Sequence, residues 1–256
     1  MADTRQFYDD LSSYYHLIFE NWDASMGRQG NALAHLISAE LGQLPPRDVR
    51  ILDAACGIGT QTLPLAALGF RLVARDLSPA AVSRLKREAD ARHLAIDAAV
   101  ADMRQVGSSV SGSFEAVLAL DNSLVHLLND EDLRTALCEF LAVLRPGGVF
   151  LCSVRDYDNV QRGEPATHVY DPRLYRGERF QLRQEWSCDD PMHYQATFII
   201  DRETVNGLAR ELCTESRFYA ISTGRLLQLM HDAGFKDCSR IDETIYQPIL
   251  AGRRVA

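Results

Sequence analysis

Hydrophobic and polar positions follow a regular order through the first part of this chain. Short apolar runs, typical of buried parallel strands, lie near 49–54, 70–75, 96–100, 114–120 and 147–154. Helical patterns lie near 60–68, 79–92 and 130–144. Strands that alternate with helices in this way predict right-handed crossovers and a parallel sheet with helices on both faces. The segment 145–148, Arg-Pro-Gly-Gly, predicts a helix stop and a turn into the fifth strand.

The pattern changes before and after this region. Residues 1–48 begin with an aromatic-rich stretch and continue with a helical pattern from about 25 to 41, which we interpret as a helical, aromatic lid segment. Residues 156–220 show two-residue periodicity, which predicts an inserted antiparallel β subdomain on the substrate side. A helix near 223–233 and strands near 235–242 and 245–254 follow. We expect 49–155 and 221–256 to form the main α/β domain.

Composition limits the class of protein. The chain has 256 residues, of which 46% are apolar and 24% charged, and its net charge is -8. This acidic balance, without a basic run, predicts no nucleic-acid partner. The polar start is unlike a signal peptide, and no apolar stretch approaches the roughly 18 residues needed to span a membrane. The six cysteines are scattered without a C-x-x-C pair, which favours a reduced, cytoplasmic protein, and we expect no metal site. A homo-oligomer is left open.

Candidate chemistry is concentrated after the first two strands. The apolar run that begins at Ile51 ends in Gly57-Ile58-Gly59, where the lack of a Cβ allows the backbone to pass close to a ligand. Asp76 ends the next run, and a carboxylate in that place can accept two hydrogen bonds from a ribose diol. Thr62 stands where the third glycine of G-x-G-x-x-G belongs, which argues against a dinucleotide. The pattern predicts a nucleoside cofactor without phosphate.

These two segments, LDAACGIGT at 52–60 and DLSP at 76–79, resemble class I S-adenosylmethionine-dependent methyltransferases. The resemblance implies a Rossmann-like seven-stranded, mostly parallel sheet whose final strand is antiparallel, and S-adenosyl-L-methionine as the cofactor. It also implies that Asp102 accepts the adenine amino group and that Met103 covers the ring. The implied cofactor-binding residues are Asp53, Ala55, Gly57, Gly59, Asp76, Leu77, Asp102, Met103, Leu120, Trp22 and Arg28.

Two further segments are similar to the glycine and glycine/sarcosine N-methyltransferase branch. The run DNSLVHL at 121–127 matches a Gly-Asn-Ser-x-x-His-Leu segment of that branch, with Asp121 in place of the glycine. Arg155 and Tyr157 match an Arg-Asn-Tyr-Asp segment whose arginine binds the substrate carboxylate. The resemblance thus implies Arg155, Tyr157 and Tyr8 on the substrate side and Tyr15, Asn122 and His126 as catalytic candidates. His126 is equally a base or a structural histidine, and no general base is identified.

The sequence therefore predicts a methyltransferase that acts on a small polar molecule, an amine or amino acid that carries a carboxylate. Two alternatives stay open. The first is a natural-product tailoring enzyme that uses the same cofactor for O-methylation or for attack at another sulfonium carbon. The second is a non-catalytic cofactor-binding scaffold on the same fold. The aromatic residues of the lid are candidates for closing the site around a cationic centre.

Overall fold

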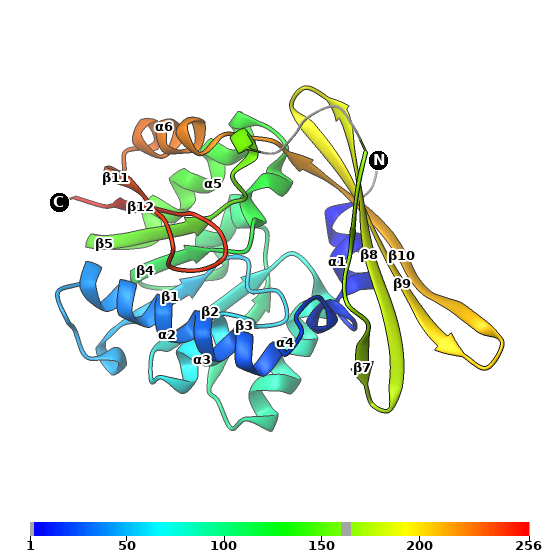
Figure 1. Cartoon of the computed structure of the whole chain (residues 1–256). Coiled ribbons are helices and arrows are strands. Elements are labelled where there is room, and N and C mark those ends of the chain that lie inside the picture. The colour runs from blue at the N-terminus through cyan, green and yellow to red at the C-terminus, as the bar shows by residue number, and fades with distance from the viewer. Residues whose placement is uncertain (1–2, 160–164, 256) are drawn as a thin grey trace.

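The strands that follow the sequence alternation form one seven-stranded sheet (Figure 1). The computed structural model describes residues 3–159 and 165–255. The strands of this sheet are β1 (Arg50–Asp53), β2 (Arg71–Asp76), β3 (Ile96–Val100), β4 (Phe114–Ala119), β5 (Leu144–Ser153), β11 (Lys236–Ile241) and β12 (Ile249–Arg253). Their order is β11-β12-β5-β4-β1-β2-β3, and only β12 is antiparallel to its neighbours. The predicted Rossmann-like fold with an antiparallel final strand is confirmed.

Helices cover both faces of this sheet. They are α2 (Trp22–Glu40), α3 (Thr62–Ala67), α4 (Pro79–Ala91), α5 (Asp130–Val143) and α6 (Thr223–Ala233), with short 3-10 turns η2 (Pro46–Asp48), η3 (Met103–Ser109) and η4 (Ser123–Leu127). Side chains alternate across a strand, so Leu72 and Ala74 pack toward α2, α3 and α4, whereas Val73 packs toward α5 and α6. Buried apolar residues at helical spacing on α5, such as Leu133 and Leu137, explain why that helix forms against the sheet.

The inserted segment forms a second, wholly antiparallel sheet. Its strands are β6 (Ala166–Val169), β7 (Arg173–Tyr175), β8 (Glu178–Asp190), β9 (His193–Thr204) and β10 (Gly207–Tyr219), which follow η5 (Tyr157–Asn159). The order is β10-β9-β8-β6, and β7 also pairs with β8. The long strands β8, β9 and β10 extend away from the main sheet (Figure 1). The two-residue periodicity therefore predicted this insertion correctly.

The N-terminal segment packs between the two sheets. It begins with α1 (Thr4–Leu11) and η1 (Tyr15–Ile18), and its Phe7 and Leu11 join Phe180 and Ile200 of the inserted sheet in one apolar cluster. On its other side, α1 contacts α4. Figure 1 shows α1 beside β8 and β10 at the side of the main sheet. The segment thus connects the inserted sheet to the α/β domain.

Asp9 on α1 provides a specific link to the α/β domain. Its Oδ1 accepts hydrogen bonds from Ser78 Oγ at 2.5 Å and from the Ala80 amide at 3.1 Å. Ser78 in turn caps α4 by accepting from the Ala81 amide at 3.0 Å. Asp9 therefore adds a second acceptor at the start of α4, where backbone N–H groups would otherwise lack partners.

Several element boundaries differ from those expected, and the last strand, expected near 245–254, begins at Ile249. Helix α2 begins at Trp22 rather than near 25, because Asn21 caps it by accepting from the Ala24 amide at 2.9 Å. Strand β5 begins at Leu144, which pairs with Phe114 before the register resumes at Val149 opposite Ala116. The segment 145–148, expected to be a turn before the strand, is therefore an irregular excursion within the strand's bounds.

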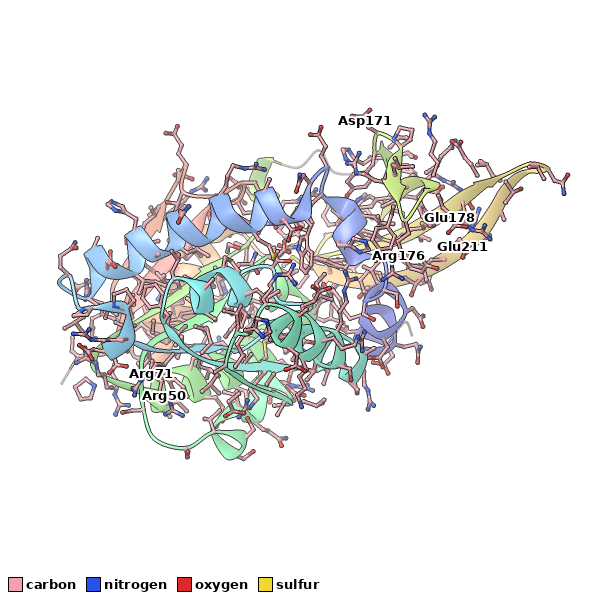
Figure 2. All side chains as sticks on the ribbon, turned by 90° about the horizontal axis from the view of Figure 1, so that it is seen from below. Arg50, Arg71, Asp171, Arg176, Glu178 and Glu211 are labelled. Atoms are coloured by element: carbon pink, nitrogen blue, oxygen red, sulfur yellow. The ribbon has the colours of Figure 1, made fainter. Side chains whose placement is uncertain are left out.

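Charged side chains lie mainly on the outside and at both ends of the molecule. Figure 2 shows Arg50 and Arg71, which are paired neighbours at the start of β1 and β2, far from Glu178 and Glu211 of the inserted sheet. Arg202 forms ion pairs with both of these glutamates. Within the described part of the chain, no helix is long and apolar enough to cross a membrane.

We expect Phe140→Ala to destabilise the fold by about 3–5 kcal/mol, because it leaves a cavity in a close-packed core. Phe140 on α5 is fully buried, and its ring centroid lies 5.1 Å from that of Phe150 on β5. Arg134→Ala, at an exposed position of the same helix, is the matched control and should change stability by less than about 0.5 kcal/mol. Urea unfolding measures both. A loss below about 1 kcal/mol for Phe140→Ala would contradict the packing described.

Candidate active site

A cavity of about 400 Å³ lies at the carboxyl ends of β1 to β4. In an open α/β sheet this edge is where ligands bind, because the loops that leave the strands diverge there. Seven of the predicted cofactor residues line this cavity: Ala55, Gly57, Asp76, Leu77, Asp102, Met103 and Leu120. The aromatic N-terminal segment closes part of it with Tyr8 and Tyr15.

The glycine turn and Asp76 form one hydrogen-bonded unit. Gly57 has φ +50°, and a Cβ added there would point into open space. Its amide donates to Asp76 Oδ2 at 2.8 Å, while the Ser78 amide donates to Asp76 Oδ1 at 2.9 Å. Burial raises the pKa of Asp76, and these two backbone bonds oppose that rise. Asp76 is thereby held at the end of β2, facing the cavity.

Three other predicted cofactor residues do not line the cavity. Asp53 is buried and accepts from Thr62 Oγ1 at 2.6 Å, and burial raises its pKa to about 6. Gly59 has φ +99°, and a Cβ there would lie 2.5 Å from Leu85 Cδ1, so this glycine permits packing against α4. Trp22 is buried and donates from Nε1 to Thr60 Oγ1 at 3.0 Å. All three residues therefore support the glycine turn instead of lining the cavity.

Arg28 is separate from this group. It lies exposed on α2 and lines neither of the two cavities described here. Its predicted role in cofactor binding therefore has no support from this geometry.

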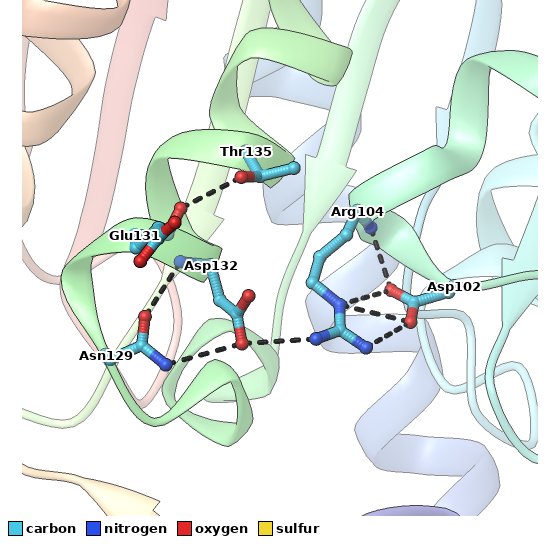
Figure 3. A network of polar contacts seen from close by, with 6 residues as sticks. All are labelled: Asp102, Arg104, Asn129, Glu131, Asp132 and Thr135. Atoms are coloured by element: carbon cyan, nitrogen blue, oxygen red, sulfur yellow. Dashed lines mark hydrogen bonds and ion pairs between the residues drawn. The ribbon is translucent and has the colours of Figure 1, made fainter.

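Arg104 bridges two carboxylates beside the cavity (Figure 3). Its guanidinium contacts Asp102 through Nε at 3.1 Å and Nη2 at 2.6 Å, and Asp132 through Nη1 at 3.1 Å. Asn129 caps α5 by accepting from the Asp132 amide at 2.8 Å. The hydrogen bonds from Arg104 lower the pKa of Asp102. The Arg104 amide also donates to Asp102 Oδ1 at 2.9 Å, so Asp102 is a fixed, ionised acceptor.

A second cavity of about 440 Å³ lies between the N-terminal segment, the inserted sheet and the loops after β4 and β5. Of the predicted residues, Tyr8, Tyr15, Asn122 and Arg155 line it. The aromatic or polar side chains that the sequence did not indicate include His168, Tyr170, Gln184, Trp186, Phe198, Phe218, Tyr246 and Gln247. This cavity is therefore built from parts of the chain that are distant in sequence.

Tyr8, Tyr15 and Asp121 line both cavities, so they mark the place where the two adjoin. Tyr15 donates to Asp121 Oδ2 at 2.6 Å, and the Tyr246 hydroxyl donates to Asp121 Oδ1. Burial raises the pKa of Tyr15 well above its ordinary value, and the negative charge of Asp121 adds to this effect. The Tyr15 hydroxyl is therefore a protonated donor to the carboxylate.

The turn after β4 is fixed by its own hydrogen bonds. Asp121 and Asn122 have φ values of +56° and +63°, in the left-handed region that non-glycine residues rarely adopt. Asn122 donates from Nδ2 to the Tyr157 hydroxyl at 2.9 Å and accepts at Oδ1 from the Arg155 amide at 2.9 Å. Tyr157 itself is 1% exposed and lines neither cavity. Asn122 and Tyr157 thus join the ends of β4 and β5.

Arg155 is the guanidinium of the second cavity. Its Cζ lies 4.6 Å from the ring centroid of Trp186, in a cation–π contact. Among the residues whose side chains the structure describes, no carboxylate forms an ion pair with Arg155. Its charge is therefore available to an anionic ligand.

His126 is held neutral. Burial lowers its pKa to about 4, so the imidazole carries no charge near neutral pH. Its Nε2 lies 2.8 Å from the Tyr8 hydroxyl and its Nδ1 lies 3.3 Å from Ser216 Oγ. This contact joins α1 to η4 beside the first cavity. In the described residues, no cluster of three or more His, Cys, Asp and Glu side chains has the geometry to hold a metal ion.

Sequence reasoning missed several of these residues. The departure of Asp121 from the glycine of the matched segment signalled an added carboxylate, but that residue was not assigned to the site. Arg104 follows two candidate residues, Asp102 and Met103, and gave no pattern of its own. Trp186 lies in the inserted sheet, and Tyr246 lies in the loop between β11 and β12. No local sequence pattern indicates that either segment folds onto the site.

Comparisons with known proteins agree with this geometry. Residues 51–148 match a family described as a methyltransferase domain. A glycine/sarcosine N-methyltransferase of Parasynechococcus marenigrum is 28% identical over 71% of this chain and 62% of its own length. One from Aphanothece halophytica is 26% identical over 89% of this chain and 80% of its own length. The chain thus spans less than two thirds of the first relative and four fifths of the second.

Solved structures show the same fold at low identity. An amino pentose methyltransferase from Micromonospora echinaspora, solved with S-adenosylmethionine bound, has a TM-score of 0.76 and 16% identity, covering 95% of each chain. A sugar N-methyltransferase from a Streptoalloteichus species has a TM-score of 0.74 and 16% identity, covering 94% of this chain and 93% of its own. These two likenesses concern the fold alone.

The domain match over residues 51–148, the fold and the cavity at the strand ends together support a class I S-adenosylmethionine-dependent methyltransferase. Within that class, the sequence relatives place the chain close to the glycine/sarcosine N-methyltransferase branch.

We expect His16 and His126 to stay neutral until the pH approaches 4. Burial lowers the pKa of each to about 4, and the nitrogens of His16 have no hydrogen-bond partner in the described structure. Unfolded histidine has a pKa of about 6.5, so the unfolded chain takes up protons first as the pH falls. The contribution of the two histidines to the free energy of unfolding should therefore decrease between pH 6.5 and 4.

Two measurements check this expectation. Histidine NMR titration should give midpoints near 4 for both residues. In addition, His16→Phe should lose less stability than the wild type over the same pH interval. The comparison cancels the opposing effects of Asp53, Asp76 and Asp121, whose raised pKa values are common to both proteins. A native midpoint near 6.5 for either histidine would refute the assignment.

Proposed function

We propose that the protein transfers a methyl group from S-adenosylmethionine to the nitrogen of a small amine or amino acid that carries a carboxylate. The observation that carries this proposal is Arg155, whose guanidinium lies on Trp186 and has no ionic partner among the described side chains, in a cavity that adjoins the cavity at the strand ends. A guanidinium binds a carboxylate through two parallel hydrogen bonds and so fixes its angle. The names of the sequence relatives, glycine/sarcosine N-methyltransferases, favour the same substrate class.

The first cavity fits the cofactor. Asp76 would accept from the ribose hydroxyls, since each of its oxygens keeps a lone pair beyond the backbone bonds. Asp102 would accept from the adenine amino group, and Met103 would cover the ring. The open space above Gly57 would admit the amino-acid part. When bound, the cofactor supplies a methyl group already activated on a sulfonium.

The protein's own task is then to position the acceptor and exclude water. Holding two reactants in attack geometry can supply roughly 7–11 kcal/mol of the barrier. Residues 1–48 would act as a lid through Tyr8 and Tyr15, and the inserted sheet of 156–220 would complete the acceptor cavity. Asn122 and Tyr157 would keep the backbone at Arg155 in place. His126, neutral and bonded to Tyr8, would position the lid rather than take a proton.

A turnover screen tests the proposed function. The purified protein would be incubated with S-adenosylmethionine and glycine, sarcosine, larger amino acids, glycolate or simple amines, and the nucleoside product identified by mass spectrometry. We expect S-adenosylhomocysteine with acceptors that carry both an amine and a carboxylate. Turnover of glycolate alone, or release of methylthioadenosine, would contradict the proposal.

Arg155→Ala should raise the KM of the acceptor found in this screen by about 10- to 100-fold, because a charge-assisted pair contributes roughly 1.5–3 kcal/mol. The affinity for S-adenosylhomocysteine should stay within about two-fold, because Arg155 does not line the first cavity. Arg179→Ala, at an exposed position on β8, is the control. Steady-state kinetics and calorimetry supply the two values. An unchanged KM would remove the carboxylate-binding role.

Asp76→Ala should weaken binding of S-adenosylmethionine by at least about 100-fold, because both hydroxyls of the ribose lose a charged acceptor. Isothermal calorimetry measures the affinity, and thermal melting verifies that the variant is folded. Asp23→Ala removes a carboxylate that is 77% exposed on α2 and should bind as the wild type does. Retained affinity in a folded Asp76→Ala protein would exclude Asp76 from the cofactor site.

A further inference from the structure

Asp121 is a carboxylate at the junction of the two cavities. It lines both of them, directly after the end of β4. The Asp121 amide donates to Ser153 Oγ at 2.8 Å, which ties the turn to the end of β5. Ser153 Oγ in turn donates to Gln247 at 3.0 Å. The backbone that carries this carboxylate is therefore fixed from two sides.

The negative charge of Asp121 has no cationic partner in the described part of the protein. Its side-chain bonds there are to the hydroxyls of Tyr15 and Tyr246, which are neutral donors. Burial raises the pKa of Asp121 above its ordinary value, which shows that the surroundings disfavour the charge. Asp121 is half-buried, and a carboxylate removed from water is usually paired with a positive group because its desolvation is costly. A ligand can supply that positive group.

The two tyrosines also direct the carboxylate. Each donates to a different oxygen of Asp121, so each oxygen keeps a lone pair for another donor. Both tyrosines line the second cavity, and Tyr246 lines only that one. Arg155 lies in the same cavity. The cavity therefore presents one anionic and one cationic group to a single small molecule, which suits a ligand that carries both charges.

We propose that Asp121 binds the amino group of the methyl acceptor and holds its nitrogen toward the first cavity, while Arg155 binds the carboxylate. This inference rests on the proposed function and deepens it by assigning the amine subsite. It also gives a reason for the rare backbone conformation at Asp121, since the left-handed turn places the carboxylate between the cavities.

The charge changes of methyl transfer explain how this arrangement would help. The neutral amine nitrogen attacks with its lone pair, the new N–C bond forms, and the C–S bond breaks with its electron pair left on sulfur. Positive charge thus moves from sulfur to nitrogen. The methylated product leaves as an ammonium ion, and the proton that the overall reaction releases is the one that the acceptor loses to solvent when it becomes the neutral amine. A fixed carboxylate beside the nitrogen stabilises the charge that develops there, without reorganisation during the step.

In the competing interpretation, the Asp121 carboxylate lies next to the sulfonium of the cofactor instead of the amino group of the acceptor. Two carboxylates of the first cavity, Asp76 and Asp102, lie among the predicted cofactor residues, whereas both hydrogen-bond donors to Asp121 line the second cavity. This placement favours the acceptor side. A comparison of S-adenosylmethionine with uncharged S-adenosylhomocysteine separates the two interpretations, because only the former carries the sulfonium charge.

The test is Asp121→Asn, which keeps the shape and removes the charge. The probe is glycine, or the amine of the screen that turns over fastest, with glycolate as the analogue that lacks the amino group. We expect kcat/KM for the amine to fall by about 30-fold or more, and calorimetry on the S-adenosylhomocysteine complex to show a similar loss of amine affinity. Glycolate affinity should change less than about two-fold.

Two variants accompany this experiment. Asp121→Gly introduces the glycine of the matched family segment, and glycine tolerates the positive φ of this turn. This variant should show the same loss of amine turnover and affinity even if Asp121→Asn disturbs folding. Asp23→Asn removes an exposed carboxylate and should behave as the wild type. Thermal melting checks that each variant is folded.

The outcomes are separable. A wild type that methylates none of the amines overturns the proposed function and this inference with it. If the wild type methylates an amine and the folded Asp121→Asn variant has unchanged kcat/KM and amine affinity, this inference alone is overturned. If Asp121→Asn loses affinity for S-adenosylmethionine but not for S-adenosylhomocysteine, the Asp121 charge acts on the sulfonium, and this inference is also overturned. Loss of amine affinity with an unchanged ratio of the two cofactor affinities supports it.

Discussion

Four parallel strands that end at one edge of a buried sheet create the constraint on which the rest of the site depends. Because β1 to β4 are hydrogen-bonded side by side, the residues that leave their carboxyl ends must converge there. The first two ends are joined further by the hydrogen bond from the Gly57 amide to Asp76. A shift in the register of either strand would separate this pair, so the pairing of the strands determines the shape of the first cavity.

The second cavity depends on a different contact, the packing of the N-terminal segment against the inserted sheet. Phe7 and Leu11 share an apolar cluster with the inserted strands, while Asp9 holds the same helix to the start of α4. These two attachments place Tyr8 and Tyr15 between the cavities. The second cavity is therefore assembled largely from elements that pack on the α/β domain, whereas the first cavity is formed mainly by the strand ends of the domain itself.

Most of the fold could be predicted from the sequence because each element has a local cause. The apolar runs gave the parallel strands, the helical patterns gave the covering helices, and the two-residue alternation gave the inserted sheet. The positions of Asp76 and Asp102 followed from the strand ends. The structure gave Gly59 and Asp53 other tasks, since Gly59 packs against Leu85 and Asp53 bonds Thr62 behind the turn. Sequence spacing does not distinguish a cavity-facing residue from its buried support.

The sequence by itself determined the fold class and the side chains that end the strands, because periodicity and turn chemistry act between near neighbours along the chain. Only the tertiary structure decided that Trp186 would lie under Arg155, that Arg104 would bridge Asp102 and Asp132, and that Tyr246 would reach Asp121. Those contacts join residues tens to more than a hundred positions apart, apart from the Asp102–Arg104 pair. They depend on how the sheets, helices and loops pack against one another, and no local sequence pattern encodes this packing.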